Sequence, residues 1–142
     1  MVCTGNICRS PTMEAVARRR IQELGLDIRV DSAGTQGWHA GEPPDPRTVE
    51  IGEAAGFRLS ELRARKVRQD DLDDFDLVLA ADRSHLEQLR RLGPGGARAR
   101  LALFLGDAEV PDPYYGTAAD FREVLGLVTR RLEAWRGDLA EF

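Results

Sequence analysis

Apolar residues along the chain form two kinds of pattern: short continuous runs, and longer stretches in which they recur at helical spacing. The continuous run Leu77–Ala81 predicts a buried strand. Two further segments, Ile28–Ser32 and Leu101–Leu105, also predict short strands. Helical spacing predicts longer helices over Pro11–Leu24, Pro46–Ala55, Asp82–Leu92 with Asp82 as N-cap, and Thr117 to about Ala140.

Proline, glycine and charged residues mark the boundaries of these elements. Pro11 suits the first turn of a helix and Gly25 its end, while Asp45 is placed to cap the helix that Pro46 starts. The acidic stretch from Asp70 to Phe75 predicts a single helical turn, and the basic stretch 63–68 before it reads as extended. Glycine and proline residues also occur in the remaining segments, where they predict turns and loops.

Strands that alternate with helices predict an α/β fold. We expect one domain over residues 1–142, with a parallel four-stranded sheet and helices on both faces. In such sheets the ligand lies beyond the carboxyl ends of the strands. The segment Cys3–Ser10 is expected there, as a phosphate-binding loop at the carboxyl end of the first strand.

Charge and composition narrow the possible functions. The formal net charge is -4, so the chain lacks the basic excess of proteins that bind nucleic acid or membrane surfaces. No apolar run is long enough to span a bilayer, and no signal peptide is recognisable, so we expect a cytoplasmic protein. Both cysteines, Cys3 and Cys8, lie in one octet, which suits a reducing compartment and catalysis better than a disulfide framework.

The octet Cys3–Ser10 carries the clearest chemical signal. Its glycine lets the loop curl so that backbone N–H groups point at one centre, and Ser10-Pro11 opens a helix whose positive end adds to the same field. Arg9 has the geometry to grip two phosphate oxygens, and Cys3 beside these donors is a candidate thiolate nucleophile. The remaining predicted loop members are Thr4, Gly5, Asn6, Ile7, Cys8 and Ser10.

A second candidate is Asp112, which lies between Pro111 and Pro113 and precedes Tyr114 and Tyr115. A carboxyl group in a stiff loop with aromatic neighbours is suited to protonate a departing phenolate. Asp-Pro is also a common turn pair. The residues alone leave the general acid and the turn as equal alternatives.

The chain resembles the low-molecular-weight protein tyrosine phosphatases from Val2 to the final helix. The likeness rests on five motifs: Cys-Thr-Gly-Asn-Ile-Cys-Arg-Ser-Pro from Cys3, Asp-Ser-Ala-Gly-Thr from Asp31, Trp38-His39, Pro-Asp-Pro-Arg from Pro44, and Asp-Pro-Tyr-Tyr-Gly from Asp112.

The resemblance implies hydrolysis of protein phosphotyrosine and of aryl phosphates through a phosphocysteine on Cys3. It implies Arg9 as phosphate clamp and Asp112 as general acid and then base. The expected partners are phosphotyrosine-containing proteins and inorganic phosphate or other oxyanions, with no cofactor. His39 and His85 are isolated from other ligand types, so we expect no metal and assign both to the surface or to loops.

Other residues are expected to support the loop or line its mouth. Asn6 and Ser10 are suited to hold the curled loop by local hydrogen bonds, and Ser32 to brace it, as the resemblance also implies. Leu62 stands where family members often carry histidine, which leaves part of that brace in question. The aromatic residues expected to wall the pocket, or alternatively to pack on neighbouring helices, are Trp38, Tyr114 and Tyr115.

Three other functions are compatible with the octet. Thioredoxin-coupled arsenate reductases resemble this family but use additional cysteines, which this chain lacks. The arginine-specific phosphatases of the family carry threonine where Ile7 stands. A non-catalytic oxyanion-binding module would be favoured by loss of Cys3, Arg9 or Asp112, and all three are present.

The start of the chain is short for the expected fold. In the resembling family a buried strand of about half a dozen residues leads into the cysteine, whereas only Met1 and Val2 precede Cys3. An empty interior slot would leave polar groups unsatisfied, at about 1 to 3 kcal/mol each. We therefore expect the natural chain to begin a few apolar residues upstream of Met1. A protein that starts at Met1 is expected either to fold poorly or to fill the gap with another segment or chain.

Overall fold

Four parallel strands form one sheet in the order β2-β1-β3-β4. The computed structural model describes every residue from 1 to 142. The strands are β1 (Val2–Cys3), β2 (Ala33–Gly34), β3 (Leu77–Ala80) and β4 (Arg100–Leu103). β1 lies inside the sheet, where Val2 pairs with both Ala33 and Ala80. The predicted α/β class with a parallel four-stranded sheet is confirmed.

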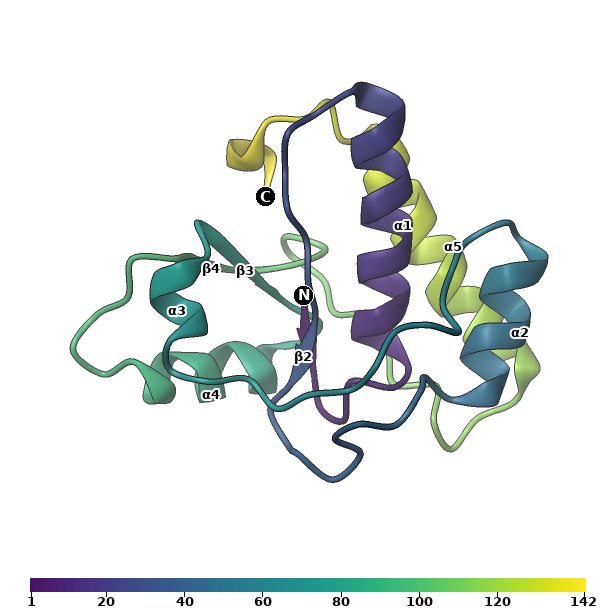
Figure 1. Cartoon of the computed structure of the whole chain (residues 1–142), viewed down its shortest axis with the longest axis horizontal. Coiled ribbons are helices and arrows are strands. Elements are labelled where there is room, and N and C mark those ends of the chain that lie inside the picture. Colours follow the sequence, from purple (N-terminus) through teal and green to yellow (C-terminus); the bar gives the residue numbers. More distant parts are fainter.

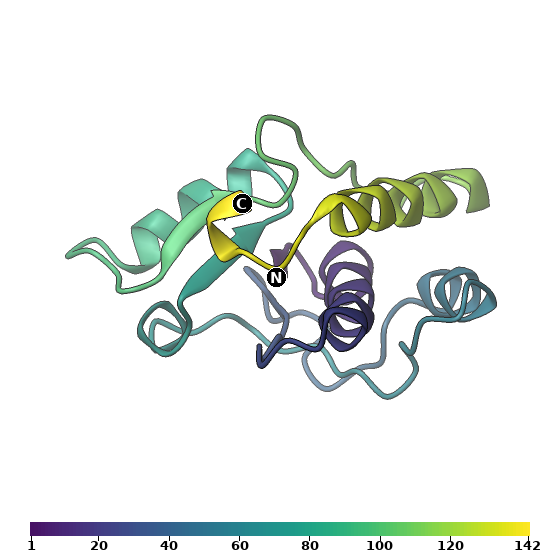
Figure 2. The same cartoon turned by 90° about the horizontal axis from the view of Figure 1, so that it is seen from above.

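Helices cover both faces of this sheet (Figure 1). They are α1 (Arg9–Leu24), α2 (Pro46–Ala54), α3 (Asp71–Asp74), α4 (Arg83–Leu92), α5 (Ala118–Ala134) and the short 3-10 helix η1 (Leu139–Glu141). On one face α1 packs against α5, which also contacts α2. Figure 2 shows these three helices gathered on the same side, away from α3 and α4. None of the helices is both long and apolar enough to cross a membrane.

The two faces of the sheet have separate cores because successive strand residues point in opposite directions. Leu79 and Cys3 belong to the cluster under α1 and α5, which includes Met13, Phe104 and Val128. Val78 and Ala80 belong to the cluster under α3 and α4, together with Leu72 and Leu89. The continuous apolar run at 77–81 is thus a strand that is buried from both sides.

One predicted strand is absent and one predicted helix end is wrong. No strand forms over Ile28–Ser32, because β1 begins at Val2 and its first partner in β2 is Ala33. The last helix ends at Ala134 instead of continuing to about Ala140, because the backbone of Trp135 is extended, with a φ of -70° and a ψ of 132°, and Asp138 then caps η1. The segment after α5 then turns back to β4, where Arg100 donates to the carbonyls of Leu139 and Phe142.

A hollow of about 290 Å³ lies at the amino end of β1. Its apolar lining includes Met1, Leu77 and Trp135. The N-terminal ammonium group of Met1 donates to the carbonyl of Asp31 at 3.0 Å. The expected upstream extension of the chain stays a prediction.

Gly52 in α2 is a position where the packing requires glycine. A Cβ atom there would lie 2.0 Å from Cδ1 of Leu59, a core side chain that is only 1 % exposed. We expect Gly52→Ala to lower the free energy of unfolding by about 1 to 3 kcal/mol, because the clash outweighs the gain in helix propensity.

Urea unfolding measures this effect, and Gly126→Ala in α5 is the matched control. A Cβ atom at Gly126 would approach only the flexible end of Arg130, at 3.1 Å. The control is therefore expected to keep or raise stability, by up to about 1 kcal/mol. Equal effects of the two substitutions would contradict the clash at Leu59.

Candidate active site

The segment between β1 and α1 forms a cradle of unused backbone donors. The N–H groups of residues 4–8 donate to no acceptor within the protein, and no side chain caps the start of α1. Asn6 has a φ of 59°, the only positive φ outside glycine, in the left-handed region that asparagine tolerates better than most residues. Five free N–H groups at a helix N-terminus are the donor set that an oxyanion requires.

Cys3 lies at the base of this cradle, where β1 ends. Its side chain is buried, and its sulfur is 3.0 Å from the hydroxyl of Ser10. The neighbouring strand end approaches closely, since a Cβ atom on Gly34 would lie 2.6 Å from the carbonyl oxygen of Thr4. Glycine at this position therefore lets β2 support the loop next to the thiol.

Arg9 is almost fully buried and held by residues from distant parts of the chain. Its Nη1 donates to Asp82 Oδ2 at 2.9 Å and to the carbonyl of Val110 at 3.2 Å. Its Nη2 donates to the hydroxyl of Thr4 at 3.3 Å and lies 3.7 Å from Asp112 Oδ2. Burial raises the pKa of Asp82, but hydrogen bonds from Ser84, the His85 N–H and Arg9 outweigh it and lower the pKa overall.

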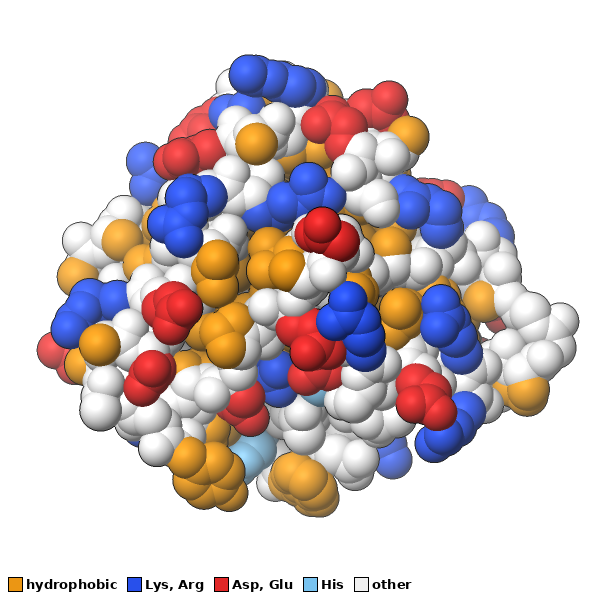
Figure 3. All heavy atoms as spheres, turned by 180° about the vertical axis from the view of Figure 1, so that it is seen from behind, with side chains coloured by type: hydrophobic (Ala, Val, Ile, Leu, Met, Phe, Trp, Pro, Cys, Tyr) orange, Lys and Arg blue, Asp and Glu red, His pale blue; other side chains and the backbone are white.

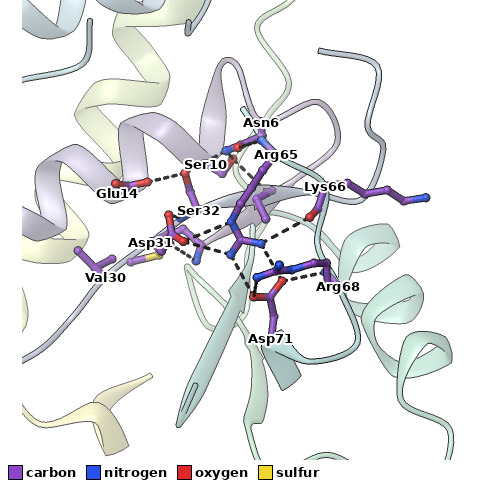
Figure 4. Close-up of polar contacts among 12 residues, drawn as sticks. Asn6, Ser10, Glu14, Val30, Asp31, Ser32, Arg65, Lys66, Arg68 and Asp71 are labelled. Atoms are coloured by element: carbon purple, nitrogen blue, oxygen red, sulfur yellow. Dashed lines mark hydrogen bonds and ion pairs between the residues drawn. The ribbon is translucent and has the colours of Figure 1, made fainter. Parts of the chain in front are cut away.

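A hydrogen-bond network behind the cradle fixes Asn6 (Figure 4). The amide of Asn6 donates to Ser10 at 2.7 Å and to Ser32 at 2.9 Å. Its oxygen accepts from the backbone N–H of Arg65 at 3.0 Å, and Ser32 donates to Glu14 at 2.6 Å. Both the amide nitrogen and the oxygen of the Asn6 side chain therefore have hydrogen-bond partners. Leu62, which stands where family members often carry histidine, provides none of them.

Arg65 anchors this network to the rest of the fold. Its guanidinium group makes ion pairs with Asp71 at 2.9 Å and with Asp31 at 3.2 Å (Figure 4). Burial raises the pKa of Asp71, but hydrogen bonds from Arg65 and from the Arg68 N–H lower it overall. Glu14, which is itself buried, pairs with Arg18 one turn later in α1.

Asp112 lies at the rim of the cradle in the loop before α5. Its Oδ1 accepts from the backbone N–H of Tyr114 at 3.1 Å, which leaves Oδ2 as the oxygen nearer Arg9. The loop is tied down at its start by Val110, whose N–H donates to Ala81, and by the fully buried ring of Pro113. The carboxyl group itself is half-exposed. Asp112 thus combines a turn hydrogen bond with a position facing the cradle.

The cradle opens into a cavity of about 240 Å³ that also touches the three predicted aromatic residues. Trp38 and Tyr115 are strongly exposed, and the Tyr114 and Tyr115 rings meet edge to face at 4.9 Å. Figure 3 shows hydrophobic side chains projecting at one edge of the molecule on either side of a histidine. These rings line the mouth, and Tyr114 also contacts α2, where the guanidinium of Arg47 lies 5.6 Å from the centre of its ring. The predicted site residues that share this cavity are Cys3, Thr4, Gly5, Ile7, Cys8, Arg9, Trp38, Asp112, Tyr114 and Tyr115.

Known proteins resemble this chain in sequence as well as in structure. The family model described as low molecular weight phosphotyrosine protein phosphatase matches residues 1–141. This chain belongs to that family. A low molecular weight protein-tyrosine-phosphatase of Streptomyces coelicolor is 47% identical over an alignment of 138 residues, and the match covers 89% of this chain and 84% of the relative.

Two solved structures of similar fold are complexes with a small ligand. The tyrosine phosphatase Wzb from Escherichia coli K30, in complex with sulphate, matches with a TM-score of 0.85 and 33% identity over 95% of this chain and 92% of its own. Vibrio vulnificus Wzb in complex with benzylphosphonate matches with a TM-score of 0.85 and 28% identity, covering 95% of this chain and 93% of that one. The recognised resemblance to the low-molecular-weight phosphatases is confirmed.

The two cysteines of this family member differ in their surroundings. Both are free and buried. Burial, reinforced by the nearby Asp45 carboxylate, raises the pKa of Cys8 to about 12. Cys8 therefore stays a neutral thiol at physiological pH, and only Cys3 is left in the cradle as a candidate nucleophile.

Some residues at the site were not found from the sequence. The sequence indicates Asp82 only as a helix cap and Arg65 only as part of a basic stretch, because their partners Arg9 and Asn6 are far away along the chain. The prediction that His85 lies at the surface or in a loop is wrong. Its side chain in α4 is fully buried and contacts Thr4 of the cradle.

Proposed function

We propose that the chain hydrolyses protein phosphotyrosine and aryl phosphates through a phosphocysteine intermediate on Cys3. The observation that carries this proposal is the common cavity, which joins the Cys3 thiol, the cradle with its free N–H groups, one arginine and one carboxyl group. Displacement of a phosphoryl group needs a nucleophile, charge stabilisation on the equatorial oxygens and a proton for the leaving group. Each of these needs has one candidate in the cavity.

In the first step the Cys3 thiolate attacks phosphorus and the bond from phosphorus to the phenolic oxygen breaks. The free N–H groups of the cradle and Arg9 stabilise the charge on the three equatorial oxygens. Asp112 gives its proton to the departing phenolate, so tyrosine leaves neutral. Oδ2 is the suitable oxygen, because Oδ1 already accepts from the Tyr114 N–H.

In the second step Asp112 acts as a base instead of an acid, and Cys3 is the leaving group. The Asp112 carboxylate takes a proton from a water molecule, whose oxygen attacks the phosphorus of the phosphocysteine. The bond from sulfur to phosphorus breaks, which restores the Cys3 thiolate and releases inorganic phosphate. No further reactant is consumed.

The depth of the cavity supports a preference for aryl phosphates. Cys3 is buried at the base, whereas the three aromatic residues stand at the mouth. A phosphotyrosine side chain is long enough to pass between the rings, while a phosphoserine is shorter. Ile7 adds an apolar wall beside the cradle, which favours a phenyl ring over the guanidinium group of phosphoarginine.

A comparison of three phosphopeptides tests the proposal. Peptides of one sequence carrying phosphotyrosine, phosphoserine or phosphoarginine are incubated with the protein, and released phosphate is measured. We expect the highest kcat/KM for phosphotyrosine. Faster release from phosphoarginine would favour an arginine phosphatase, and release from none of the three would favour a non-catalytic oxyanion-binding module.

A further inference from the structure

Thr4 and His85 form a pair at the cradle that the proposed mechanism does not use. Nε2 of His85 lies 2.7 Å from the hydroxyl oxygen of Thr4. His85 comes from α4 and is fully buried, whereas Thr4 lines the cavity beside Cys3 and Arg9. The hydrogen bond between Thr4 and His85 therefore places the imidazole directly behind the wall of the cradle.

The proton on His85 can be assigned from its other contact. The backbone N–H of Asp82 donates to Nδ1 at 3.2 Å, and since an N–H group can only donate, Nδ1 must carry a lone pair. Nδ1 also lies 3.2 Å from the Asp82 carboxylate, but an unprotonated nitrogen makes no ion pair there. Burial lowers the pKa of His85 and Arg9 acts in the same direction, against the carboxylates of Asp82, Asp112 and Glu109. The ring is therefore neutral, and its hydrogen lies on Nε2.

The direction of the Thr4 hydroxyl hydrogen follows from this assignment. The oxygen of Thr4 accepts one hydrogen bond from His85 Nε2 and another from Arg9 Nη2 at 3.3 Å. A hydroxyl has two lone pairs and one hydrogen, so both lone pairs are occupied. The hydrogen has no acceptor in the protein and must point away from His85 and Arg9, on the side of the cavity.

We propose that the Thr4 hydroxyl is an additional donor to the oxyanion in the cradle, and that His85 is the residue that positions it. The hydroxyl adds a side-chain donor to the five backbone N–H groups. The bond from His85 holds the hydroxyl oxygen in place, so that its hydrogen stays turned toward the anion. The proposal rests on the proposed function for its ligand class, a tetrahedral phosphate-like anion.

Two substitutions at Thr4 separate the hydroxyl from the shape of the side chain. Thr4→Val keeps the shape and removes the donor, while Thr4→Ser keeps the donor. Calorimetric titration with tungstate is expected to show affinity about ten- to a hundredfold weaker in Thr4→Val, as for loss of a hydrogen bond to a charged group. Thr4→Ser should bind within about threefold of the parent, by the same reasoning. Parent-like binding by Thr4→Val, or equal losses in both variants, would overturn the proposal.

A double-mutant cycle tests the part assigned to His85. Asparagine at this position keeps an acceptor for the Asp82 N–H but is too short to reach Thr4. His85→Asn should therefore weaken tungstate binding in the parent and have no further effect in the Thr4→Val protein. Independent, additive losses would reduce His85 to a structural role. If His85→Asn fails to fold, as judged by circular dichroism, the Thr4 variants still decide the proposal.

Tungstate binding needs no turnover, so this experiment separates the inference from the proposed function. A protein that binds tungstate through Thr4 but hydrolyses no phosphopeptide would refute the enzymatic proposal alone. A protein that hydrolyses phosphotyrosine with parent-like kcat/KM in Thr4→Val would refute the inference alone. Failure of the parent to bind tungstate would count against the donor role of Thr4.

Discussion

Replacement of Cys3 by serine is expected to abolish turnover of aryl phosphates while tungstate still binds. The hydroxyl of serine is a far weaker nucleophile than a thiolate, and loss of a nucleophile lowers kcat by at least about ten-thousandfold. Oxyanion binding depends on the N–H groups of residues 4–8 and on Arg9, none of which is changed. The fold tolerates the exchange because serine is similar in size to cysteine.

Acid-quench trapping of the phosphoenzyme measures the covalent step directly. Labelled phosphate should remain on the parent protein after a burst of phenol release and be absent from Cys3→Ser. Cys8→Ser is the matched control, because it removes the other buried thiol of the same loop. It should still form the labelled intermediate. Appreciable turnover by Cys3→Ser, or loss of the label only in Cys8→Ser, would refute the assignment of the nucleophile.

Replacement of Asp112 by alanine is expected to slow the hydrolysis of phenyl phosphate by about a hundred- to ten-thousandfold. A phenolate is a poor leaving group and needs the proton from Asp112. The rate with dinitrophenyl phosphate should fall much less, since that leaving group departs without protonation. Steady-state kcat for the two substrates, measured side by side, gives the ratio that tests the acid role.

Asp112→Asn is the matched variant for this experiment. Its amide oxygen keeps an acceptor for the Tyr114 N–H, so the loop stays anchored, but the amide has no proton to transfer. The asparagine variant should therefore resemble Asp112→Ala in its selective loss. Equal losses on both substrates, or parent-like activity of Asp112→Asn, would leave Asp112 with the turn role that Asp-Pro pairs often have.

Local sequence signals predict the cradle, but they do not predict the residues that hold it in place. The cysteine, the glycine, the arginine and the helix start lie within eight consecutive positions, so their spacing alone predicts the loop. Asp82, His85 and Arg65 reach the cradle from other elements, and nothing in their immediate sequence marks them as partners of Arg9, Thr4 or Asn6. Such long-range pairings follow from the strand order, which a single sequence does not display.

The errors in secondary structure have a similar cause. Apolar residues at 28–32 suit a strand, but a strand also needs a neighbour to pair with, and the ladder of β2 starts only at Ala33. The predicted helix runs past Trp135, but Trp135 is already extended, and Gly137 then takes a positive φ that does not continue a helix. Intrinsic preference was overridden in both places by pairing or by backbone geometry.

The way Arg9 is held has a consequence for the thermodynamics of ligand binding. Its Nη1 edge is fixed by Asp82 and Val110 before any anion arrives. A mobile arginine loses about 0.5 to 1.5 kcal/mol of side-chain entropy when it closes on a ligand. In this protein the side-chain entropy of Arg9 is lost when the chain folds. The guanidinium group is therefore already ordered when the anion binds. The carboxylate of Asp82 that holds Arg9 also caps α4. The start of this helix and the preorganised arginine therefore form together.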